Sequence, residues 1–61
     1  MGQRYVAVWC SDVGWTVFRA DVISIVAPLN GYARITERTG NVYNTLALLD
    51  TVVEALLWAR Q

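Results

Sequence analysis

The sequence predicts an α+β fold, in which an antiparallel sheet of three or four strands is followed by one C-terminal amphipathic helix. Three observations lead to this expectation. Short runs of β-branched and aromatic residues recur from residue 5 to residue 43. Glycine, asparagine and proline separate these runs at turn positions. Residues 46–61 instead carry leucine, valine and alanine at helical spacing. Because no linker or change of composition interrupts the chain, we expect residues 1–61 to form a single β-β-β(-β)-α domain.

The first half of the chain predicts a hairpin and a further extended segment. Residues 5–10 are apolar on both alternating faces and end at a turn that contains Gly14. Residues 15–20 follow at hairpin distance, and residues 22–27 have equally strong β propensity. The pattern allows two interpretations of residues 15–27, either two strands or one bent strand with a bulge near Ala20 and Asp21.

A second hairpin is expected after Pro28, which ends the preceding run, and the turn signal at residues 30–31. Residues 32–38 alternate, so that Tyr32, Arg34 and Arg38 share one face of a strand. A turn at residues 39–41 leads into a short strand at residues 42–44. Helix is expected directly afterwards, with Asn44 or Thr45 as its N-cap.

The C-terminal helix carries more apolar surface than one contact requires. Wound at 100° per residue, residues 46–61 place their apolar side chains over about 200°, against about 100° for an ordinary core-facing stripe. One flank would cover the sheet, and the other would meet a partner. The opposite face holds Asp50, Glu54 and Trp58. The residues expected at an oligomer interface are Leu49, Val52, Val53 and Leu56.

Chain length and composition favour self-association. A domain of about 60 residues buries only about 60% of the surface that its unfolded chain exposes. The 61 residues contain 56% hydrophobic residues, above the ~45–50% that is usual for a soluble domain. Cys10 is the only cysteine, so an intrachain disulfide is impossible. We therefore expect a homo-oligomer, most simply a homodimer.

Charge and hydropathy limit the classes of partner. The five basic residues are all arginine, and five acidic residues bring the net charge to zero. This balance argues against a general nucleic-acid coat and against binding to an anionic membrane. Since no apolar run has the length of a signal peptide or a membrane span, we expect a cytoplasmic protein. Arginine without lysine or histidine is associated with bacterial or phage origin.

The residues that usually perform catalysis are few. The chain has no histidine and no lysine, and its glycines form no phosphate-binding loop. Cys10 lies inside a predicted strand and is interpreted as a buried thiol. Asp50 and Glu54 are interpreted as a solvated helix face, because two carboxylates alone make a poor metal site. We expect no enzymatic activity, no cofactor and no metal.

Tyr32, Arg34 and Arg38 form the recognition surface that the sequence predicts, since tyrosine and arginine suit contact with a partner. The same arginines would also fit a solvated sheet face. Trp58 is a further candidate contact, whereas Trp9 and Trp15 are expected to pack in the core or on the sheet. We expect a small regulatory protein-interaction module, with a DNA-binding regulator and a structural oligomer subunit as alternatives.

Residues 21–57 resemble the first half of LytTR-type DNA-binding domains. The similarity lies in Asp-Val-Ile-Ser-Ile at residues 21–25, Asn-Gly-Tyr at residues 30–32, Arg-Ile-Thr at residues 34–36, Gly-Asn-Val-Tyr at residues 40–43, and the leucine-rich segment from residue 46. The resemblance implies that Tyr32 and Arg34 lie where such domains approach DNA. Over nearly its full length the chain also resembles small FlbD-like flagellar proteins.

Overall fold

The computed structural model describes residues 5–60 as a five-stranded antiparallel sheet with one C-terminal helix. In chain order, the elements are β1 (Tyr5–Cys10), β2 (Gly14–Arg19), the 3-10 helix η1 (Ala20–Val22), β3 (Ile23–Leu29), β4 (Tyr32–Glu37), β5 (Val42–Leu48) and α1 (Leu49–Ala59). The predicted α+β class and the C-terminal helix are confirmed. The strand count is slightly higher than the three or four expected.

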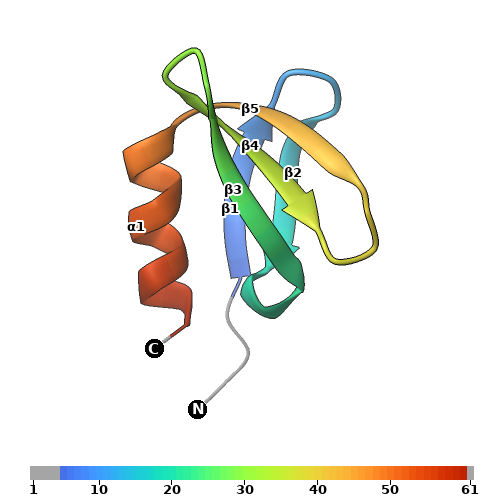
Figure 1. Ribbon diagram of the computed structural model, residues 1–61, viewed down its shortest axis with the longest axis vertical. Coiled ribbons are helices and arrows are strands. Elements are labelled where there is room, and N and C mark those ends of the chain that lie inside the picture. Colours follow the sequence, from blue (N-terminus) through green and yellow to red (C-terminus); the bar gives the residue numbers. More distant parts are fainter. Residues whose placement is uncertain (1–4, 61) are drawn as a thin grey trace.

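The sheet has the strand order β2-β1-β5-β4-β3 (Figure 1). Two hairpins, β1–β2 and β3–β4, flank β5, which pairs antiparallel with β1 and with β4. Cys10 lies opposite Thr45 where β1 meets β5. The last strand of the chain therefore joins two local hairpins into one sheet, and β2 and β3 become its two edges.

The segment from residue 15 to residue 27 forms two strands. A single 3-10 turn, η1, separates β2 from β3. Ala20 in this turn is buried, whereas Arg19 and Asp21 on either side are exposed. A 3-10 turn redirects the chain within a few residues. This change of direction carries the chain from one edge of the sheet to the other.

The predicted start of the helix is wrong, because β5 continues through Leu48 and α1 begins at Leu49. Thr45 is buried in the middle of this strand instead of capping a helix. Its hydroxyl Oγ1 donates to the carbonyl of Ala33 at 2.9 Å and accepts from the N–H of Ala47 at 3.3 Å. The register between β4 and β5 shifts at this point. Strand pairing thus outweighs the local helical pattern of residues 46–48.

Thr45→Val should destabilise the protein by about 1–3 kcal/mol, because it leaves the Ala33 carbonyl and the Ala47 N–H without their partner. Urea denaturation followed by circular dichroism measures this change. Thr51→Val is the matched control, since Thr51 is exposed on α1 and its replacement should change stability by about 0.5 kcal/mol or less. Equal stability of the two variants would contradict the role of Thr45.

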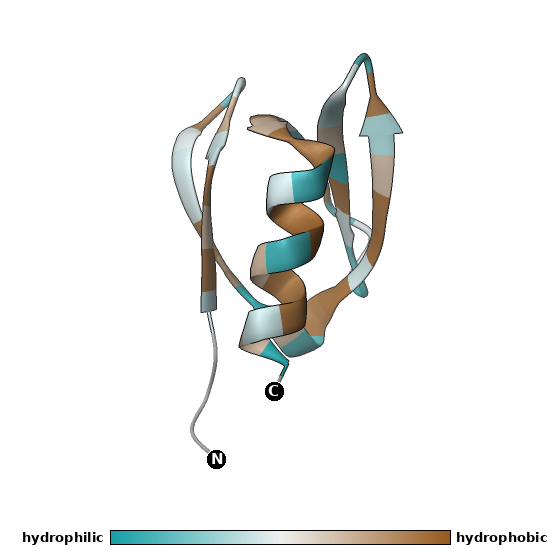
Figure 2. Cartoon of the chain, turned by 90° about the vertical axis from the view of Figure 1, so that its left-hand side faces the viewer, coloured by the Kyte–Doolittle hydropathy of each residue, from teal (hydrophilic) through white to brown (hydrophobic). Residues whose placement is uncertain are grey.

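The helix fills the inner side of the curled sheet. Figure 2 shows α1 lying across the opening between the β1–β2 hairpin and the β3–β4 hairpin. Arg60, directly after α1, donates from Nη2 to the carbonyl of Ala20 at 3.2 Å and to that of Ile23 at 3.0 Å. These bonds hold the end of α1 against the start of β3. The core consists of Val6, Val8, Cys10, Phe18, Ala20, Ile23, Ala33, Ile35, Val52, Leu56 and Ala59.

The helix residues expected at an oligomer interface need correction. Val52 and Leu56 are buried in the core of a single chain, and Leu49 packs partly against it. Of the four expected interface residues, only Val53 is exposed. The apolar arc of α1 is wide because most of it is used inside the domain. Leu57 and Trp58 are the other large apolar side chains that α1 exposes.

Within residues 5–60, no helix has the length and apolar character needed to cross a membrane.

Candidate functional site

Tyr32 and Arg34 lie on the outer face of β4, as expected from their alternation with the buried Ala33 and Ile35. Both side chains are exposed. The Arg34 guanidinium is held toward β5, because its Nε donates to Oδ1 of Asn44 at 3.1 Å. The structure therefore places these two predicted contact residues on one surface, and Arg34 already has an intrachain partner.

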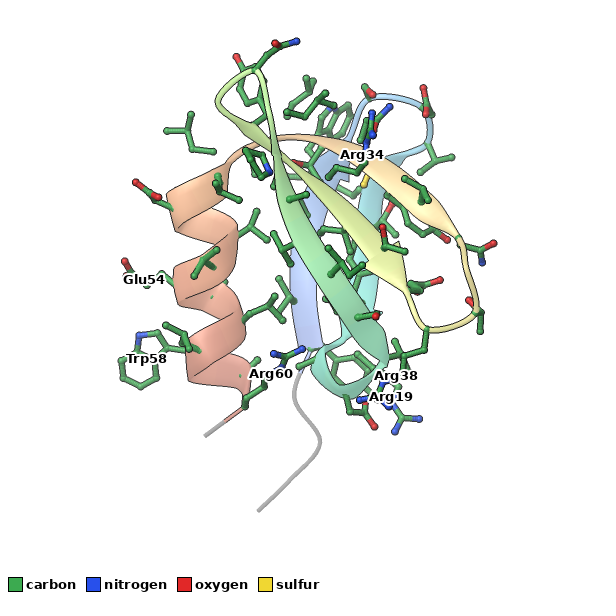
Figure 3. All side chains as sticks on the ribbon, viewed as in Figure 1. Arg19, Arg34, Arg38, Glu54, Trp58 and Arg60 are labelled. Atoms are coloured by element: carbon green, nitrogen blue, oxygen red, sulfur yellow. The ribbon has the colours of Figure 1, made fainter. Side chains whose placement is uncertain are left out.

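Arg38 is not part of this surface. Strand β4 ends at Glu37, so Arg38 lies in the following turn, where its N–H donates to the carbonyl of Val22 at 2.8 Å. Figure 3 shows Arg38 and Arg34 at opposite ends of the sheet. The expectation that Arg38 shares a strand face with Tyr32 and Arg34 is wrong, because β4 ends at Glu37, one residue before Arg38.

Trp58 lies on α1, on the opposite side of the molecule from Arg19, Arg34 and Arg38 (Figure 3). Its side chain is 68% exposed. Trp58 lies on the same side of α1 as Glu54, four positions earlier, whereas the exposed Val53 and Leu57 lie toward β3. Trp58 is thus free for contact, but it belongs to a different surface from Tyr32 and Arg34.

The largest exposed aromatic cluster lies on the β1–β2 hairpin, where the sequence patterns did not predict a contact surface. Trp9 lies directly opposite Trp15, and Tyr5 lies opposite Arg19. The inward residues Val6, Val8 and Phe18 are buried, so the aromatic residues at alternate positions face outward. Hairpin pairing therefore aligns two tryptophans that are six positions apart in sequence.

The two tryptophans make an edge-to-face contact. Their ring centroids are 5.6 Å apart, with an angle of 85° between the ring planes. Gly14, where the hairpin turn meets β2, has a positive φ of 83° that favours glycine. A Cβ at Gly14 would lie 3.8 Å from the Trp9 ring, so the indole covers this turn closely. The pair is an ordered surface feature whose outer rings remain exposed.

The apolar surface continues from β1 onto β5. Since Cys10 lies opposite Thr45 in an antiparallel pair, Trp9 and Leu46 are neighbours on the outer face. Both are exposed, as is Val17 on β2. We use the name tryptophan face for the outer-face residues Tyr5, Trp9, Trp15, Val17 and Leu46. Alternation across the β1–β2 hairpin was the signal for this face, but both alternating sets of residues 5–10 are apolar, so the pattern alone did not show which set is exposed.

An ion pair marks one end of the tryptophan face. Arg19 binds Asp21 through two bonds, Nε to Oδ1 at 3.1 Å and Nη2 to Oδ2 at 2.7 Å. The hydrogen bond to Asp21, reinforced by its negative charge, raises the pKa of the Arg19 guanidinium above its ordinary value. Because the acid compensates the arginine, the pair adds no net charge to this end of the face.

The other chemical groups lie apart from this face. Cys10 is 1% exposed and faces the core. Among residues 5–60, no three residues of the histidine, cysteine, aspartate and glutamate types lie together as metal ligands would. A half-open pocket of about 190 Å³ lies between β3 and α1. Its lining residues are Ile23, Ser24, Val26, Val53, Leu56, Leu57 and Arg60.

The fold and surface define a small α+β domain with an exposed aromatic sheet face. No protein-family model, no curated protein and no solved structure matches this chain.

Proposed function

We propose that this chain is a small non-enzymatic regulatory module that binds a protein partner through the tryptophan face and also associates with itself. The observation that carries this proposal is the cross-strand pair Trp9–Trp15 on the outer face of β1 and β2. Trp15 is 70% exposed although it is one of the most apolar side chains by area. Residues of this type are enriched where protein interfaces gain most of their binding energy.

The arrangement of the face supports a protein partner. Trp9, Trp15 and Leu46 form contiguous apolar surface over three strands, and the fixed edge-to-face geometry lowers the entropy lost on binding. Arg34 and Arg19 lie near its margins, where charged groups commonly form the polar rim of an interface. An apolar centre with a polar margin is the composition expected of a site for another folded surface.

Protein binding fits the charges better than the DNA-binding alternative does. The Arg19 and Arg34 side chains are bonded to Asp21 and Asn44, and Arg38 lies at the far end of the sheet from Arg34. A DNA-binding surface usually gathers its cationic groups to neutralise several phosphates at once. Arg34 lies apart from Arg19, Arg38 and Arg60, which lie around η1. Of these three, Arg19 is compensated by Asp21 and Arg60 is bonded to backbone carbonyls.

The proposal is tested by replacing two equally exposed tryptophans, one on each surface. Tagged parent, Trp15→Ala and Trp58→Ala proteins are used to capture partners from the source cell, and the captured protein is then purified for calorimetry. We expect Trp15→Ala to weaken binding by about 30-fold or more, as for a central aromatic anchor. Trp58→Ala should bind as the parent does.

Two results would contradict the proposal in different ways. If only Trp58→Ala loses the partner, the exposed side of α1 around Trp58 is the binding surface. If the captured species is nucleic acid and its affinity falls steeply with salt, the DNA-binding alternative holds. Circular dichroism of both variants confirms that the comparison is made between folded proteins.

A further inference from the structure

The two edges of the sheet differ in how they are protected against pairing. Edge strands expose unpaired backbone groups, and proteins commonly block them with proline or a bulge. Strand β3 has both, since it contains Pro28 and its register shifts between Ile23 and Ile25. Strand β2 pairs with β1 in unbroken register and contains no proline. Within residues 5–60, no strand covers the outer side of β2.

The backbone groups that β2 directs outward follow from its pairing. The N–H of Ser11, at the end of β1, donates to the carbonyl of Asn44 on β5 at 2.9 Å. Because successive residues of a strand bond to opposite sides, odd-numbered residues of β1 bond toward β5 and even-numbered residues toward β2. The β2 partners of those even-numbered residues are Gly14, Thr16 and Phe18. The N–H and C=O groups of Trp15, Val17 and Arg19 therefore point to the open edge.

We propose that a second copy of this chain pairs with β2 through its own β2, antiparallel about a two-fold axis at Val17. In this register Val17 lies opposite itself, and Trp15 lies opposite Arg19 of the second copy. The outward N–H and C=O groups of Trp15, Val17 and Arg19 then form hydrogen bonds with those of the same three residues in the second copy. The resulting dimer has one continuous sheet, and the second copy contributes Arg19 beside Trp15.

Other registers pair fewer of these groups. A shift of the two-fold axis by one residue toward Thr16 places Arg19 opposite Val13 in the turn. A shift to Arg19 places two guanidinium groups opposite each other, which is unfavourable. Only an axis at Val17 pairs all three outward residues with one another, because Val17 is the middle residue of Trp15, Val17 and Arg19. The geometry of the exposed edge is thus self-complementary in one register.

Charge and exposure also favour a second copy as the occupant. The chain has zero net charge, so two copies do not repel each other as whole molecules. Trp15 and Val17 are both largely exposed, and pairing would place them beside Arg19 and Val17 of the second copy, covering their flanks and leaving the outer surface of the tryptophan face free. The inference rests on the self-association part of the proposed function, and it assigns that association to β2 instead of α1.

A charge exchange at residue 17 tests the proposed axis. Sedimentation velocity should show that the parent dimerises between micromolar and submillimolar concentrations. Val17→Lys should raise the dimer dissociation constant by about 10-fold or more, because two ammonium groups would lie directly opposite each other. Mixing Val17→Lys with ¹⁵N-labelled Val17→Glu should restore a one-to-one heterodimer, which native mass spectrometry distinguishes by mass. This rescue is specific to a residue that faces itself.

A proline at the same residue tests the backbone pairing. Since the Val17 N–H points to the open edge, Val17→Pro removes no hydrogen bond between β1 and β2. It does remove the two Val17 N–H donors at the centre of the dimer. We expect it to raise the dissociation constant by about 100-fold or more, whereas Val17→Thr, which keeps the N–H, should remain dimeric.

Four results would overturn the inference. A parent that stays monomeric throughout refutes self-association as a whole, whereas the capture experiment with Trp15 and Trp58 variants still decides partner binding. A parent dimer that persists in both Val17→Lys and Val17→Pro refutes the β2 edge alone. A dimer lost only in Leu57→Asp assigns association to α1. Loss of the dimer in Val17→Lys without rescue by Val17→Glu refutes the two-fold axis at Val17.

Discussion

Leu56→Asp should abolish the cooperative folding of this protein. Leu56 is 5% exposed and lies in the core on α1, so the aspartate would place an unpaired charge in an apolar interior. Such a substitution costs about 4 kcal/mol or more. A chain of 61 residues has a total stability of about 3–9 kcal/mol. Circular dichroism and one-dimensional proton NMR should therefore show a largely unfolded chain.

The neighbouring residue provides a matched control. Leu57 is 62% exposed, so Leu57→Asp keeps its charge in water and should shift the melting temperature by about 5 °C or less. If Leu56→Asp melts as cooperatively as Leu57→Asp, the orientation of α1 on the sheet is wrong. A loss of dimer together with retained folding in Leu56→Asp would return this residue to an oligomer interface.

Phe18→Ala should destabilise the protein by about 3–5 kcal/mol, the cost typical of removing a buried phenylalanine. Phe18 is 1% exposed and packs edge-to-face on Tyr43 of β5, with ring centroids 4.9 Å apart and 79° between the planes. This contact fastens β2 to the centre of the sheet. Since Trp15 and Val17 lie on the same strand, loss of Phe18 should also loosen the tryptophan face.

Urea denaturation at one fixed protein concentration measures this effect, because self-association adds to apparent stability. Tyr32→Ala is the control, since it removes an exposed aromatic from a strand and should cost about 1 kcal/mol or less. Similar losses in the two variants would show that Phe18 is not a core anchor. A denaturation slope that changes in Phe18→Ala alone would indicate loss of compactness as well as stability.

Sequence patterns predicted the candidate surfaces only where one face of an element is clearly polar. Tyr32 and Arg34 alternate with Ala33 and Ile35, and this contrast correctly indicated the outward face of β4. On β1, tryptophan and tyrosine alternate with valine and cysteine, so both faces qualify for burial by composition. The exposure of Trp9 became apparent only because α1 covers the opposite face of the hairpin, where Val6 and Val8 are buried.

The amino-acid sequence by itself determined the α+β class, the turns, and the burial of Ala33 and Ile35, because alternation and turn chemistry act over a few residues. Tertiary structure decided what depends on distant partners. Residues 46–48 carry a helical apolar pattern, yet they extend β5 because strand pairing and the bonds of Thr45 outweigh local propensity. The same pairing placed Val52 and Leu56 in the core and left Trp15 exposed, since a sheet of five strands presents only one face to a single helix.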